Sequence, residues 1–111
     1  MKRKQIELRF GDKTYTLEYN RESVCLMEQD GFDASKMKEA PATAMYKLFA
    51  GAFKANHKKI KNEEVDDILV NIKDKTGLYN RLIEMFEYTM STLFTDRDDG
   101  TEGNATWETN W

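Results

Sequence analysis

Two short runs of alternating residues, separated by Gly11-Asp12, constrain the fold of this chain more than any other feature. Apolar and polar side chains alternate in residues 6–10 and again in residues 15–19. A period of two is typical of strands with one buried face. Glycine in the first central position of a two-residue connection favours a type II′ turn. The sequence therefore predicts a β-hairpin over residues 4–19.

The register of this hairpin follows from the turn. A type II′ turn at Gly11-Asp12 puts Phe10 opposite Lys13, Leu8 opposite Tyr15 and Ile6 opposite Leu17. Both apolar rows then fall on one face, whereas a slip of one residue would separate them. Glu18 belongs to the polar row and is expected to face solvent, so its truncation to alanine should be nearly silent. Two strands alone are not stable in water, so helices must cover the apolar face.

Four helices are predicted after the hairpin, over residues 21–30, 42–56, 62–72 and 77–94. Apolar residues recur there at intervals of three and four, which marks one buried stripe on each helix. Asn20 and Asn62 are the expected N-caps of the first and third helices, and Gly31 is expected to end the first. A further short helix, capped by Asp33, is predicted before Pro41.

The 111 residues suit a single domain. We predict an α+β domain over residues 1–95, with the hairpin packed on about four helices, and an acidic flexible tail over 96–111. Residues 1–61 carry 13 Lys and Arg against 8 Asp and Glu, a balance of +5. Residues 62–111 carry 4 against 12, a balance of −8. Such complementary halves favour either docking within the chain or head-to-tail contact between copies.

The sequence offers no pattern of catalytic or cofactor-binding residues. His57, the only histidine, lies in a lysine cluster and is interpreted as a solvated loop residue. Cys25, the only cysteine, falls on the apolar side of the first predicted helix and is interpreted as a core residue. One histidine and one cysteine cannot form an ordinary zinc site, and no glycine-rich loop precedes a helix. We predict a protein that is not an enzyme and binds no cofactor or metal.

Membranes and nucleic acids are not expected partners. No apolar run approaches the roughly 18 residues of a membrane span, and a single cysteine suits a reducing cytoplasm. Lys47, Lys54, Lys58 and Lys61 would lie along one side of a continued helix. Acidic residues follow them directly, and no aromatic platform is interleaved, which argues against a phosphate-binding patch. We therefore expect a cytoplasmic protein that contacts other proteins.

Methionines and tryptophans are the candidate partner-binding residues. Methionines in the predicted helices are interpreted first as core filling, and alternatively as an adaptable surface for apolar segments. Both tryptophans lie in the polar tail, which is either unused or a linear docking motif. The candidate partner-binding residues are Met45, Met85, Met90, Trp107 and Trp111.

The N-terminal third resembles a known family. The segments Ile6-Glu-Leu-Arg-Phe-Gly-Asp-Lys-Thr-Tyr-Thr-Leu-Glu-Tyr19, Asn20-Arg-Glu-Ser-Val-Cys-Leu-Met-Glu28 and Gly31-Phe32 are similar to tail assembly chaperones of long-tailed phages and prophages of Gram-positive bacteria. In the order of its motifs and in chain length, the resemblance covers about residues 5 to 95. It carries no residue-level functional motif, so no site residues transfer.

The resemblance implies a function in tail morphogenesis. A protein of this family binds the tape-measure protein and tail-tube subunits, tends to form a homo-oligomer, and is absent from the mature virion. Many members are also made in a longer form by ribosomal frameshifting. The alternative function, from another class, is a small phage regulatory protein that binds DNA or acts as an anti-repressor.

Overall fold

The computed structural model describes residues 4–94 and 108–111 and begins with a two-stranded antiparallel sheet. Strands β1 (Ile6–Phe10) and β2 (Lys13–Leu17) pair in the predicted register, with Leu8 opposite Tyr15. Gly11 has a φ of 64°, and Asp12 is not among the described residues with a positive φ, as a type II′ turn requires. The hairpin and its register are therefore confirmed.

Helix α1 (Arg21–Gln29) begins at the predicted residue and ends one residue before the predicted residue 30. The Asn20 side chain accepts a hydrogen bond from the Ser23 backbone N–H at 2.8 Å, and the Ser23 hydroxyl accepts one from the Asn20 N–H at 2.8 Å. These two bonds form a capping box. Gly31, at φ 95°, follows the helix as expected. The short helix predicted before Pro41 is a single 3₁₀ turn, η1 (Ala34–Lys36), capped by Asp33.

Helix α2 (Pro41–Gly51) is shorter than the predicted range of 42–56. The apolar stripe continues past its end, and Ala52 and Phe53 are fully buried. Their backbone, however, turns toward the hairpin, and the Ala52 carbonyl accepts a hydrogen bond from the Glu18 N–H at 3.0 Å. The N–H groups of residues 52–54 still make turn-like bonds to carbonyls three residues earlier, but the Ala52 carbonyl bonds to the hairpin. The periodicity of the side chains therefore overestimated the length of the helix.

Helix α3 (Asn62–Val70) also ends earlier than the predicted residue 72. Its N-cap is Lys61, whose side chain makes no capping bond, so the expected capping role of Asn62 is wrong. Glu63 and Glu64 lie in the first turn, where the helix dipole stabilises negative charge. The charges of Glu63 and Glu64 stabilise the start of α3, although no side chain caps it.

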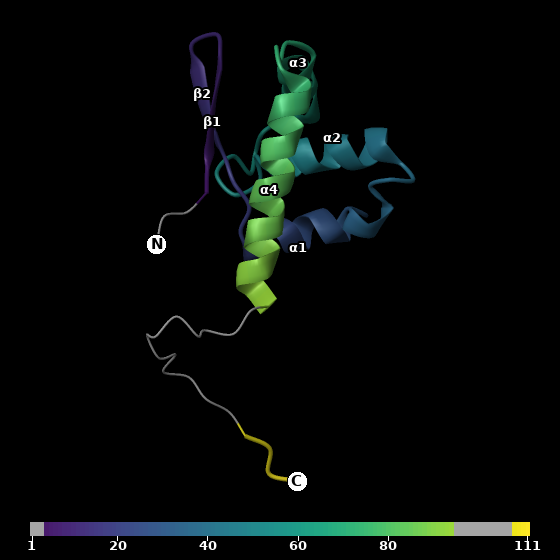
Figure 1. Cartoon of the computed structure of the whole chain (residues 1–111). Helices are drawn as coiled ribbons and strands as arrows, with labels where there is room; N and C mark the ends of the chain where they lie inside the picture. Colours follow the sequence, from purple (N-terminus) through teal and green to yellow (C-terminus); the bar gives the residue numbers. More distant parts are fainter. Residues whose placement is uncertain (1–3, 95–107) are drawn as a thin grey trace.

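Helix α4 (Lys75–Phe94) begins two residues before the predicted residue 77. The Asp74 carboxylate accepts a hydrogen bond from the Gly77 N–H at 3.0 Å, in the manner of an N-cap. With four α-helices after the hairpin in its described residues, the chain is an α+β domain, as predicted (Figure 1).

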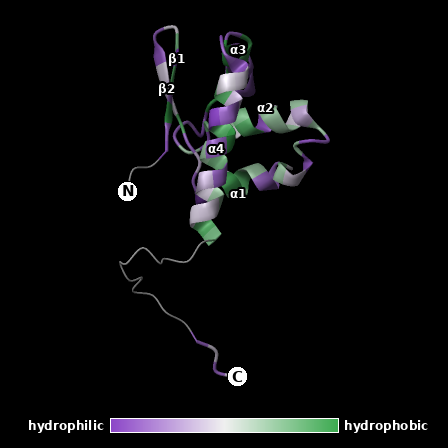
Figure 2. Cartoon of the chain, in the orientation of Figure 1, coloured by the Kyte–Doolittle hydropathy of each residue, from purple (hydrophilic) through white to green (hydrophobic). Residues whose placement is uncertain are grey.

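The helices pack as a crossed layer beside the hairpin. Helices α1 and α2 lie side by side, and α4 crosses in front of them, with the hairpin on the other side of α4 in this view (Figure 1). Helix α2 is largely hydrophobic along its length, whereas the tip of the hairpin is hydrophilic (Figure 2). Helix α2 contacts both α1 and α4. These two contacts explain its apolar composition.

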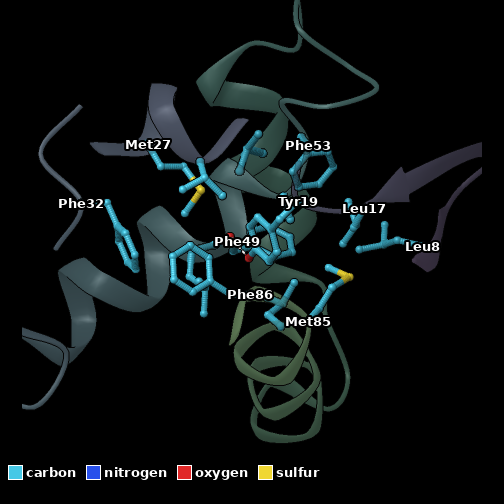
Figure 3. Packing of buried hydrophobic residues seen from close by; sticks show 14 of the residues in the cluster. Leu8, Leu17, Tyr19, Met27, Phe32, Phe49, Phe53, Met85 and Phe86 are labelled. Carbon is cyan, nitrogen blue, oxygen red and sulfur yellow. Dashed lines mark hydrogen bonds between the residues drawn. The ribbon is translucent and has the colours of Figure 1, made fainter. Parts of the chain in front are cut away.

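One apolar core joins all these elements (Figure 3). Its fully buried members come from β2, α2, the segment after α2, and α3 and α4: Leu17, Leu48, Phe49, Ala52, Phe53, Ile68 and Leu82. Aromatic rings meet edge to face, as in the pair of Phe49 and Phe53 at 5.2 Å between centroids. The hairpin is thus part of the core and not an appendage.

Tyr19 carries a polar group into this core. Its hydroxyl donates a hydrogen bond to the Leu48 carbonyl at 2.6 Å, and its ring packs against Phe86. The Thr89 hydroxyl donates a hydrogen bond to the Tyr19 carbonyl at 3.3 Å. Burial raises the pKa of Tyr19 well above its ordinary value, because the charged phenolate would lose its hydration. Tyr19 therefore links the end of β2 to both α2 and α4.

Candidate binding groove

A groove lies between the start of β1 and one face of α4. Its volume is about 430 Å³. Its walls are Lys4, Gln5 and Ile6 on the strand side and Arg81, Glu84, Met85 and Tyr88 on the helix side. The helical residues are spaced by three and four, which places them on one face of α4. The strand residues come from the start of β1, so the groove exists only where the hairpin packs beside α4.

The groove has an apolar floor and a charged rim. Met85 is 3% exposed and Ile6 is half-buried. Above them the Lys4 ammonium lies 5.1 Å from the centroid of the Tyr88 ring, a cation–π contact. The exposed Arg81 and Glu84 form an ion pair at 3.1 Å on the rim. Such a surface can accept an apolar side chain of a partner and orient it by charge.

The three candidate methionines do not form one surface. Met85 lies in the groove, whereas Met90 lines a separate hollow of about 530 Å³ beside Phe32 and Phe86. Met45 is half-buried on α2 and packs against the core. Five positions separate Met85 from Met90, which turns them to different faces of α4. Core filling accounts for much of their placement, and Met85 alone borders the groove.

The tryptophans fall in the C-terminal segment. Trp107 and most of the predicted tail lie outside the described residues. Trp111 is 98% exposed, and residues 108–111 contain no helix or strand. The docking role of the two tryptophans therefore stays a prediction.

Cys25 and His57 differ from their predicted environments. Cys25 is exposed, because the buried face of α1 is made by Ser23, Val24 and Met27. His57 is not a solvated loop residue. Its Nε2 accepts a hydrogen bond from the Thr16 N–H at 3.0 Å, and its ring meets Tyr15 edge to face. His57 therefore holds the outer edge of β2.

Glu18 is the largest departure from the expected pattern. It is 4% exposed, although the alternation of the strand predicted a solvent-facing side chain. Strand β2 ends at Leu17, and the chain then bends so that three successive residues are buried. The carboxylate accepts hydrogen bonds from Asn56 at 2.9 Å and from Gln5 at 3.0 Å. No local signal in the sequence points to these partners, which lie 38 and 13 residues away.

Together these contacts form a clasp between β2 and residues 52–57. The clasp comprises the Glu18 N–H to the Ala52 carbonyl, the Thr16 N–H to His57, and the Asn56 amide to the Glu18 carboxylate. An edge strand with unpaired backbone groups is prone to pair with other chains. On that edge the clasp bonds the backbone groups of Thr16 and the N–H of Glu18 to the chain's own turn.

Glu18→Ala is now expected to destabilise the domain by about 2 kcal/mol, because buried hydrogen bonds to a charged group are lost. Glu18→Gln should cost less, since its amide oxygen can still accept from Asn56. Chemical denaturation followed by circular dichroism measures both, with the exposed Glu87→Ala as the control. Equal midpoints for Glu18→Ala and Glu87→Ala would contradict the clasp.

The two charged halves of the chain, residues 1–61 and 62–111, meet where β2 contacts the start of α3. The Tyr15 hydroxyl donates to the Glu64 carboxylate at 2.8 Å, and the Lys13 ammonium lies 3.7 Å from it. Burial and the hydrogen bond to Glu64 raise the pKa of Tyr15. Burial and a hydrogen bond to Asp66 likewise raise the pKa of Tyr46 on α2. Contacts within the chain thus account for part of the charge complementarity between residues 1–61 and residues 62–111.

The predicted row of lysines is not built on one helix, because α2 ends at Gly51, after Lys47 and before Lys54. Lys47 donates to the Asp30 carbonyl at 2.7 Å, and Lys58 pairs with Glu22 at 2.5 Å. Both cations therefore have partners within the chain.

In residues 4–94 and 108–111, no group of three or more His, Cys, Asp or Glu side chains is placed to hold a metal ion. Over the same part of the chain, no helix has the length and apolar character needed to cross a membrane.

The fold and groove define a small α+β domain with a hairpin clasped to a helical body. The chain belongs to the family described as "Domain of unknown function (DUF5055)", whose model matches residues 2–111. No curated protein and no solved structure matches the chain significantly.

Proposed function

We propose that this protein is a chaperone of phage tail assembly that shields apolar helical segments of a tape-measure protein until tail-tube subunits replace it. The observation that carries the proposal is the groove between β1 and α4, with its apolar floor at Ile6 and Met85. Flexible methionine side chains suit the binding of varied apolar partners. The resemblance of residues 5 to 95 to tail assembly chaperones supplies the identity of the partners, the cytoplasmic location and the absence from the mature virion.

The groove suits a helical segment in its chemistry. A partner helix that presents apolar side chains at intervals of three or four could place one or two of them over Met85 and Ile6. The paired charges of Arg81 and Glu84 on the rim would then meet the polar flank of that helix. Contacts of this size bind weakly and reversibly, as a chaperone that must be displaced requires.

Co-expression with the protein encoded immediately downstream tests this function, if that protein is long and rich in heptads. We expect it to stay in solution and to copurify with the tagged chain. Tyr88→Ala should reduce the copurified amount at least about tenfold by removing an aromatic wall of the groove. Tyr79→Ala is the matched control, because Tyr79 is also half-buried on α4 but does not line the groove.

Two results would contradict the proposal. One is no copurification from either the wild-type chain or the Tyr79→Ala variant. The other is a gel shift with DNA fragments that salt weakens strongly, which would favour the regulatory DNA-binding alternative.

A further inference from the structure

The outer edge of β1 is the open edge of the sheet. The Thr16 N–H and carbonyl are directed to His57 and Asn56, away from β1. Glu7 lies opposite Thr16, so this pair is not hydrogen-bonded and the backbone groups of Glu7 also point away from the partner strand. Arg9, two residues on, has the same orientation. Within residues 4–94 and 108–111, no other segment bonds to this edge.

We propose that two copies of this chain pair through this edge, β1 against β1 in antiparallel orientation about Leu8, to form a continuous four-stranded sheet. The argument for the pairing does not rest on the proposed function, although Ile6 borders both the groove and the paired strand. A two-fold axis at Leu8 lets Glu7 and Arg9 of one copy exchange backbone hydrogen bonds with Arg9 and Glu7 of the other. All outward backbone groups of the two strands are then satisfied.

Charge complementarity selects this partner and this register. Side chains directly opposite one another interact, and like charges there are destabilising. In the proposed register each Glu7 faces an Arg9 of the other copy. Both side chains are exposed, at 60% and 78%, and within one copy they form an ion pair with each other at 2.9 Å, which the pairing exchanges for ion pairs between copies. A second copy therefore supplies an ordered set of opposite charges.

The neighbouring registers are disfavoured by the same charges. A shift of two residues in one direction puts Glu7 opposite Glu7, and a shift in the other direction puts Arg9 opposite Arg9. A shift of one residue would put the apolar row of one strand beside the polar row of the other. In the proposed register Leu8 meets Leu8 and the half-buried Ile6 meets Phe10, all on the apolar face.

Charge-reversal variants of the full chain test this pairing by sedimentation velocity over a range of concentrations. The wild type should dimerise. Glu7→Lys alone and Arg9→Glu alone should each raise the dimer dissociation constant by about tenfold or more, since both opposed pairs become like-charged. An equimolar mixture of the two variants should dimerise about as well as wild type, because opposite charges again face each other. The double variant E7K/R9E should do the same.

Far-UV circular dichroism and melting temperature verify that each variant is folded, which is expected because both positions are exposed. The distant, exposed Glu87→Lys is the control for net charge and should leave the dissociation constant unchanged. A wild type that stays monomeric up to millimolar concentration overturns the pairing. A mixture that associates no better than either variant alone overturns it as well, because association would then use another surface.

Discussion

Leu17→Asp should unfold the domain or nearly so. Leu17 has no exposed surface and lies in the core beneath the hairpin. Its replacement buries a carboxylate with no partner and removes the apolar contact that joins β2 to the helices. An uncompensated buried charge costs about 5 kcal/mol, which is close to the whole stability of many small domains. Circular dichroism and a melting curve should show the loss of a cooperative transition.

The matched control is Thr14→Asp, which adds the same charge to an exposed position of the same strand. It should change the free energy of unfolding by no more than about 0.5 kcal/mol. Similar melting temperatures for Leu17→Asp and wild type would contradict the observed register, in which Leu17 pairs with Ile6 on the buried face.

Phe53→Ala should cost about 3–5 kcal/mol, the range for removing a fully buried aromatic ring. Phe53 is 0% exposed and contacts Phe49, Tyr15 and His57 edge to face or nearly so. The cavity would open where the hairpin meets the helices, so the clasp should loosen as well. Urea denaturation measures the loss, and faster amide exchange of the Thr16 N–H would report the clasp directly.

Phe94→Ala provides the comparison, because Phe94 is 79% exposed at the end of α4. It should shift the free energy of unfolding by no more than about 0.5 kcal/mol. A Phe53→Ala variant as stable as Phe94→Ala would contradict the placement of residues 52–57 in the core.

Local patterns predicted the parts of the fold that depend on neighbouring residues. The hairpin register followed from Gly11 and from a period of two, and the start of α1 followed from Asn20. The buried stripe predicted for the second helix is present in α2, where Leu48 and Phe49 are fully buried. Each of these features is determined within about ten residues of chain, where propensity and turn geometry act.

The site depends on contacts that local patterns do not encode. Asn56 and His57 reach β2 across about 40 residues, and this contact bends the chain after Gly51 where the periodicity predicted more helix. The alternation of apolar and polar residues predicts a solvent-facing Glu18 only if the strand continues, but β2 ends at Leu17. The groove needed both the hairpin and α4 in place, so Met85 was a candidate from the sequence but its neighbours Lys4 and Tyr88 were not.

The clasp also sets the order in which the chain can complete its fold during synthesis. The Thr16 N–H can bond to His57 only after His57 has been synthesised, 41 residues later in the chain. At roughly 5–20 residues per second on the ribosome, that interval is about 2–8 s. Through this time the nascent hairpin has one uncovered apolar face and two open edges, the features that favour aggregation. The first element to leave the ribosome is therefore protected only after half the domain has followed it.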